Sequence, residues 1–209
     1  MNALTENYRE RLVRRGLRLE YLTLGWNLLE AAIAVGAGVV SGSIALVGFG
    51  VDSAIEMSSG AILLWRLASD REETSRERIE ARALKLVGAS LVALAVYVAA
   101  EAAKSLIQRE SPQVSYVGMA LAAAALAVMP LLARAKRRVA AQIESRALVA
   151  DSRQSDICAW LSAILLVGLA LNAWLGWWWS DPVAALLMVP IIAKEGIEAF
   201  RGERSCGCG

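Results

Sequence analysis

Long apolar runs separated by short polar links dominate the chain. A helix needs roughly 20 mostly apolar residues to cross the hydrocarbon core of a bilayer, and six runs are about that long. They cover residues 19–40, 44–67, 84–107, 114–133, 147–175 and 182–200. The pattern predicts an all-α membrane protein built as a bundle of six transmembrane helices, with no soluble domain large enough to fold alone.

The segments outside these runs are short and polar. Residues 1–18 are basic and lack the apolar stretch of a cleavable signal peptide, so we expect a cytosolic N-terminal tail. Residues 19–200 form the predicted membrane domain, and residues 201–209 form a short cytosolic tail that contains cysteines. The Arg- and Glu-rich link 69–83 is expected to extend a helix into solvent.

Charge separates the two sides of the predicted bundle. The chain is 57% hydrophobic and 20% charged. Lys and Arg gather in both tails and in the links after the second and fourth runs, whereas the other side has Lys104 and Arg109. The positive-inside rule therefore predicts cytosolic termini, in a multi-pass protein of the plasma (inner) membrane if the source is bacterial. The net charge of +2 gives no indication of a nucleic-acid partner.

Two acidic residues interrupt the second run, which is otherwise apolar. Asp52 and Glu56 are four residues apart, so a helix places both carboxylates on one face, one turn apart. A charge inside the membrane costs at least ~2.5–3.5 kcal/mol and indicates a partner or a purpose. Two such carboxylates cannot both stay ionised without a cation, so they share protons, bind a metal ion, or hydrogen-bond neighbouring helices as neutral groups.

The fifth run carries a second polar face. Asp151, Gln154 and Cys158 follow helical spacing and share one side, together with Ser155. Carboxylate, amide oxygen and thiolate ligands suit a borderline cation such as Zn²⁺, although Cys158 can equally be a small buried apolar residue. Asp156 is expected to point elsewhere, toward other partners or the cytosolic entrance.

Further charged residues occur in the first and third runs. Glu30 is expected at about the depth of Asp52, as a further ligand, a proton carrier, or a structural partner of Asn27. Glu101 and Lys104 are three residues apart near the outer edge, where we expect a local ion pair.

The acidic one-turn pairs on the second and fifth helices resemble those of the cation diffusion facilitator family. Asp52-Ser53-Ala54-Ile55-Glu56 fits that family's second-helix motif, with Glu in place of the second Asp. Ala150-Asp151-Ser152-Arg153 fits the usual lead-in to its fifth-helix motif, which places Gln154 at the His position and Cys158 at the Asp position. The resemblance implies a metal site formed by Asp52, Glu56, Asp151, Gln154 and Cys158.

The chain departs from that family in two respects. It contains no histidine, whereas the family's second link is often His-rich. It is expected to be a short form without the cytosolic metal-binding domain, in which Cys206 and Cys208 form either an incomplete soft-metal site or a loose end.

The function expected from the resemblance is efflux of a divalent, zinc-like cation by alternating access, with protons as counter-ions. No cofactor beyond the transported cation and no enzymatic activity are expected, and a homodimer would form through membrane helices. Two alternatives remain: an organic-cation/proton antiporter that uses Asp52 and Glu56 as counter-charge, and a non-transporting membrane scaffold.

Overall fold

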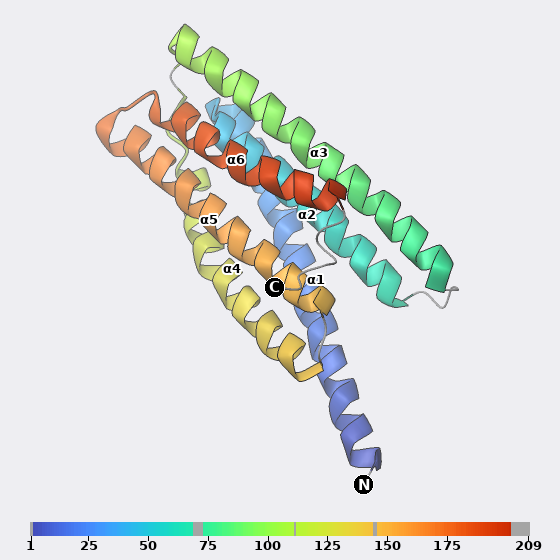
Figure 1. The fold of residues 1–209 in the computed structure, drawn as a ribbon. Coiled ribbons are helices and arrows are strands. Elements are labelled where there is room, and N and C mark those ends of the chain that lie inside the picture. The colour runs from blue at the N-terminus through green and yellow to red at the C-terminus, as the bar shows by residue number, and fades with distance from the viewer. Residues whose placement is uncertain (1, 69–72, 111, 144–145, 202–209) are drawn as a thin grey trace.

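The computed structural model describes residues 2–68, 73–110, 112–143 and 146–201. Within these ranges every regular element is a helix, which confirms the predicted all-α class. The helices are α1 (Asn2–Ser41), α2 (Ile44–Ala68), α3 (Glu73–Gln108), α4 (Tyr116–Ile143), α5 (Arg146–Leu175) and α6 (Ser180–Arg201). They run alternately in opposite directions along one bundle, so the described chain ends lie toward the same end (Figure 1).

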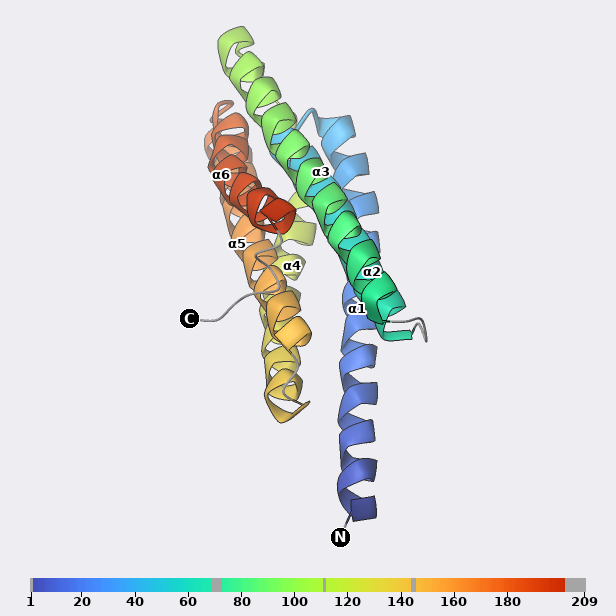
Figure 2. The ribbon, with the colours of Figure 1, turned by 45° about the vertical axis from the view of Figure 1, so that its right-hand side comes forward.

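Two helices begin well before the apolar runs that predicted them. α1 begins at Asn2 rather than at residue 19, and its N-terminal part projects beyond the rest of the bundle (Figures 1 and 2). Leu12 and Gly16 are buried, and Gly16 packs beside Val139 and Leu148. One side of the basic segment therefore has a packing surface, which explains why it continues the helix. α3 begins at Glu73, so the expected helical extension of link 69–83 is confirmed from that residue onward.

Four of the described helices contain stretches long and apolar enough to cross a membrane. These stretches are Arg11–Ser41, Lys85–Gln108, Tyr116–Gln142 and Asp151–Leu175. At 1.5 Å per residue, α2 and α6 are about 37 and 33 Å long, comparable with the roughly 30 Å hydrocarbon core.

Helix α2 lies at the centre of the bundle, in contact with α1, α3, α5 and α6. Its first turn is fixed by a residue from another helix. The Asp181 carboxylate at the start of α6 accepts a hydrogen bond from Ile44 N at 2.9 Å and another from the Ser43 hydroxyl. Ser43 Oγ in turn accepts from Leu46 N at 3.1 Å, so two oxygens satisfy the free N–H groups of the α2 N-terminus.

Helices α3 and α6 are in backbone contact. A Cβ added to Gly88 would lie 2.5 Å from Phe200 N and 2.6 Å from Gly196 O, closer than any side chain tolerates. Small residues allow membrane helices to approach in this way, because close packing rather than the hydrophobic effect drives their association. Helix α6 is thus held against α3 along the part of its length that carries Glu195.

Candidate cation site

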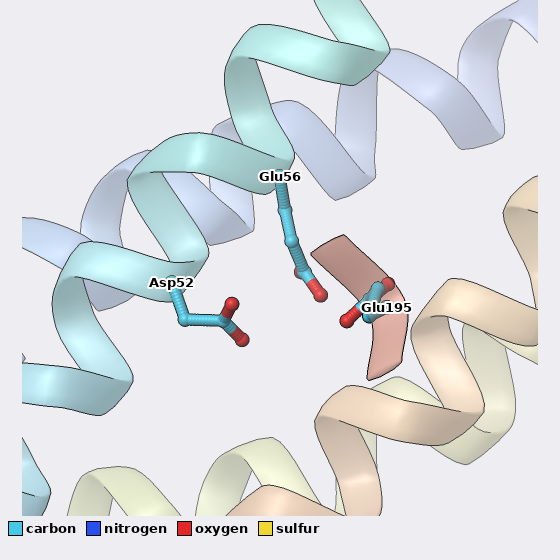
Figure 3. A group of neighbouring side chains, drawn as sticks. All are labelled: Asp52, Glu56 and Glu195. Atoms are coloured by element: carbon cyan, nitrogen blue, oxygen red, sulfur yellow. The ribbon is translucent and has the colours of Figure 1, made fainter. Parts of the chain in front are cut away.

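Three buried carboxylates from two helices converge at the centre of the bundle. Asp52 and Glu56 lie one turn apart on α2, as predicted, and point toward Glu195 on α6 (Figure 3). They are 1%, 6% and 3% exposed, respectively. One oxygen from each carboxylate lies within 4.8 Å of the other two. Oxygens about 2.0–2.2 Å from one tetrahedral Zn²⁺ lie roughly 3.3–3.6 Å from one another, so enclosing an ion would draw these carboxylates together by up to about 1.5 Å.

The burial of these groups limits what the cluster can do. Several carboxylates in a site of low dielectric cannot all remain ionised unless a cation or protons balance their charge. The arrangement is therefore suited to holding a metal ion, to holding protons, or to exchanging one for the other.

Two amide side chains orient Glu56. Gln154 Nε2 on α5 donates to Glu56 Oε1 at 2.9 Å, and Asn27 Nδ2 on α1 donates to Glu56 Oε2 at 3.3 Å. Asn27 Oδ1 is buried and has no hydrogen-bond partner in the part of the chain that the structure describes. This amide oxygen is adjacent to the carboxylates and is chemically suited to be a fourth ligand.

Glu30 lies beside this cluster and contacts it through Ser53. Its Oε2 accepts a hydrogen bond from Ser53 Oγ at 2.8 Å and lies 3.7 Å from Cys158 Sγ, while its Oε1 accepts from Trp26 Nε1 at 3.3 Å. Ser53 is the neighbour of Asp52 on α2, so Glu30 is linked to the helix that carries the two predicted acids. The thiol of Cys158 is fully buried and lies against Glu30.

Asp151 makes its contact outside the three-carboxylate cluster. It forms an ion pair with Lys136 of α4, and the Lys136 ammonium also lies 3.1 Å from Glu20 Oε2 on α1. Lys136 is completely buried, although the sequence placed it among the basic residues of a link. Of the five predicted site residues, the recorded contacts link Asp52, Glu56 and Gln154 to one centre, and Asp151 to another.

Two smaller predictions are confirmed. Asp156 points away from the cluster and pairs with Arg137 on the exposed side of α4 and α5. Lys104 and Glu101 form the expected local ion pair at 3.3 Å. Cys206 and Cys208 lie outside the described residues.

Sequence reasoning did not single out Glu195. It stands between Lys194 and the more exposed Glu198, near the end of the sixth apolar run, where charged residues usually face water. The available signal was helical spacing: Met188, Ile192, Glu195 and Ala199 are all buried and follow steps of three and four residues, so Glu195 lies on the apolar face.

Comparison with known proteins places this chain within a described type of membrane domain. The sequence model of the cation efflux transmembrane domain matches residues 21–204. An uncharacterized transporter of Synechocystis sp. is 28% identical over 171 residues, which cover 79% of this chain and 55% of that protein. One of Methanocaldococcus jannaschii is 26% identical over 85% of this chain and 64% of its own length. Transmembrane protein 163 of Xenopus laevis is 25% identical over 92% of this chain and 67% of its own length.

The chain thus spans between about half and two thirds of the length of these relatives.

Proposed function

This chain belongs to the cation efflux family, and from that premise we propose that it moves a divalent cation across the membrane in exchange for protons. The observation that carries the proposal is the convergence of Asp52, Glu56 and Glu195 in the membrane domain, all at least nine-tenths buried. Burying three ionised carboxylates in a membrane domain costs free energy that a bound cation would offset.

The oxygen atoms of this cluster favour a metal ion that binds oxygen ligands. Carboxylates bind Zn²⁺, which is the first candidate, and they also suit Mn²⁺. Asn27 Oδ1 would complete a four-oxygen set with the three acids. Glu30 and Cys158 would support the site from one layer further out, through the contact of Glu30 with Ser53.

Exchange follows from competition for the same oxygens. An empty site keeps protons, because three buried carboxylates repel one another when ionised. A divalent cation expels those protons when it binds, and protons that return from the opposite side release it again. Transport should therefore weaken when the pH falls on the side from which the cation is loaded.

The direction of loading follows from topology. In the proposed arrangement all six helices span the membrane, and both termini lie on the cytosolic side with most of the Lys and Arg residues. Alternating access would then expose the carboxylates first to the cytosol and afterwards to the outside, with helix motions that open one end of the bundle at a time.

The test is metal flux and proton counterflow in proteoliposomes, measured for Zn²⁺, Mn²⁺, Co²⁺ and Mg²⁺. Asp52→Asn and Glu195→Gln should each lower both fluxes at least tenfold while the thermal midpoint changes little, since each removes a buried charge. Glu198→Gln is the matched control on α6, because Glu198 is 43% exposed and pairs with Lys194. Parent-like flux in Asp52→Asn and Glu195→Gln would place the transport site elsewhere.

One observation favours a different substrate. A groove of about 340 Å³ between α5 and α6 has an apolar part, which includes Trp160 and Ile191, and a charged part formed by Lys194, Glu195 and Glu198. An organic cation with an apolar body would fit such a groove, with its charge at Glu195. Thermal stabilisation by tetraphenylphosphonium but by none of the metals would favour that alternative, and stability effects without any flux would favour a scaffold.

A further inference from the structure

A second cluster of buried charges lies one helical turn from the three carboxylates. Glu20 on α1 is 3% exposed, and its Oε1 lies 3.0 Å from the position that a Cβ would take on Gly60 of α2. Gly60 follows Glu56 by four residues, and Asp151 precedes Gln154 by three. Both steps lead toward the end of the bundle that holds the chain ends, where the cation is loaded in the proposed function.

The occupant of this cluster is an ammonium group of the protein itself. Lys136 extends from α4, is fully buried, and places its Nζ against Asp151 and 3.1 Å from Glu20 Oε2. Apart from this ion-pair contact with Lys136, Glu20 Oε2 has no hydrogen-bond partner among the residues that the structure describes. The two carboxylates therefore share one ammonium group, and ionisation of both leaves one negative charge that Lys136 does not balance.

We propose that Glu20 and Asp151 form a second binding position for the divalent cation. The Lys136 ammonium occupies this position until the cation displaces it. The proposal rests on the proposed transport function. A divalent cation balances two carboxylates fully, and both offer the hard oxygen ligands that such ions prefer. The second position lies one helical turn nearer the loading end of the bundle than the three-carboxylate site. A cation that enters from that end would bind there first.

The choice of lysine supports an exchangeable occupant. An arginine would bind carboxylates through a rigid, two-pronged contact, whereas a lysine is a point charge on a flexible stem. The neighbouring Arg137 already joins α4 to α5 through Asp156 on the exposed side. A permanent brace between these helices thus exists beside the buried lysine.

The experiment counts Mn²⁺ ions bound per chain by equilibrium dialysis of the purified full chain. Mn²⁺ is chosen because thiolates compete poorly for it, so that the tail cysteines do not contribute. The parent should bind one ion tightly. Lys136→Gln should bind two, because it removes the competing ammonium, and the double variant Glu20→Gln/Lys136→Gln should return to one. Arg137→Gln is the matched control: it removes a cation from the same helix pair and should leave the count at one.

The outcomes separate this inference from the proposed function. If the parent binds one ion and Lys136→Gln also binds one, the second position is wrong while the transport proposal stands. If the parent binds none, the transport proposal fails, whereas a single ion gained by Lys136→Gln would still support the second position. Asp52→Asn in the Lys136→Gln background should remove the first ion only.

Lys136→Gln leaves two buried carboxylates without their counter-charge and can fail to fold in the absence of metal. Solubilisation with Mn²⁺ present then becomes the measurement. Recovery of folded protein with Mn²⁺ supports the proposal. Failure to recover it, when the neutral variant Glu20→Gln/Lys136→Gln/Asp151→Asn folds normally, overturns it.

Discussion

Glu56 depends on its neighbours for its orientation. Gln154 and Asn27 donate to its two oxygens from α5 and α1, so three helices meet at one carboxylate. Such outer contacts commonly decide how well a metal ligand performs, because they fix the direction of its lone pairs.

Replacing Gln154 by Leu should weaken divalent-cation binding about tenfold to hundredfold, because Glu56 loses the donor at 2.9 Å that orients it. Calorimetric titration with Zn²⁺ gives the affinity. Gln142→Leu, an equivalent change at an exposed position of α4, should leave affinity unchanged. Equal affinities in the two variants would show that Glu56 needs no support from α5.

For single residues, the sequence predicted the spacing of the acidic side chains along a helix better than it predicted their contacts with other helices. The four-residue step from Asp52 to Glu56 is a local property, and the structure places both on one face as expected. The partner of Asp151 was beyond reach, because Lys136 stands in a run of basic residues typical of a cytosolic link. Only the packing of α4 against α1 and α5 turns that lysine inward, and long-range packing leaves no trace in a single sequence.

Among the elements, α3 and α6 behave as a unit because their backbones touch. Gly88 and Gly196 have no Cβ, and this absence permits the contact. The unit matters for the site because Glu195 adjoins Gly196, so the position of the third carboxylate depends on how closely α6 approaches α3.

Gly88→Ala should destabilise the fold by about 1–3 kcal/mol, since the new methyl group would overlap the backbone of Phe200 and Gly196. Thermal unfolding in detergent measures the change. Gly36→Ala on α1 is the matched control, because a Cβ there meets nothing within 4 Å, and it should be neutral or slightly stabilising. A similar midpoint for both variants would contradict the close packing of α3 and α6.

Helix existence was predictable, and helix ends were not. Each of the six apolar runs corresponds to one helix of the structure. The beginning of α1 was missed because residues 2–18 lack a long apolar run. The burial of Gly16 depends on Val139 of α4 and Leu148 of α5, which supply a surface for one side of that basic segment.

At the scale of the whole molecule, two of the loops between helices lie at the opposite end of the bundle from the described chain ends. The alternation of helix directions puts residues 42–43 and 176–179 at one end and the described chain ends at the other. The first end is tied by hydrogen bonds such as Gln113 N to Ser41 O at 2.7 Å, and the second by the ion pairs of Lys136 and Arg137.

We expect Arg137 to be cytosolic and Glu110 to be external. Single cysteines at these positions, in a chain whose three cysteines are replaced, should react with an impermeant maleimide from opposite sides of the membrane. The control is labelling after permeabilisation, which should make both reactive. Reaction of both from the same side in sealed vesicles would exclude the six-span arrangement.

Because the three acids are divided between α2 and α6, the spacing of these two helices depends on whether protons or a metal ion balance their charge. Where two of these carboxylates are ionised within 4.8 Å of each other, they repel by at least about 3 kcal/mol at an effective dielectric constant near 20, and protons held by the empty site remove most of that repulsion. A bound divalent cation attracts the carboxylates of both helices and draws α2 and α6 together. The distance between α2 and α6 therefore reports whether the site holds an ion. Spin labels at Ser58 and Ile197, with the tail cysteines replaced by serine, should report a narrower distance distribution once Zn²⁺ is added. Glu195→Gln should abolish that narrowing, whereas an unchanged distribution in a Zn²⁺-loaded parent would mean that the ion exerts no pull between the two helices.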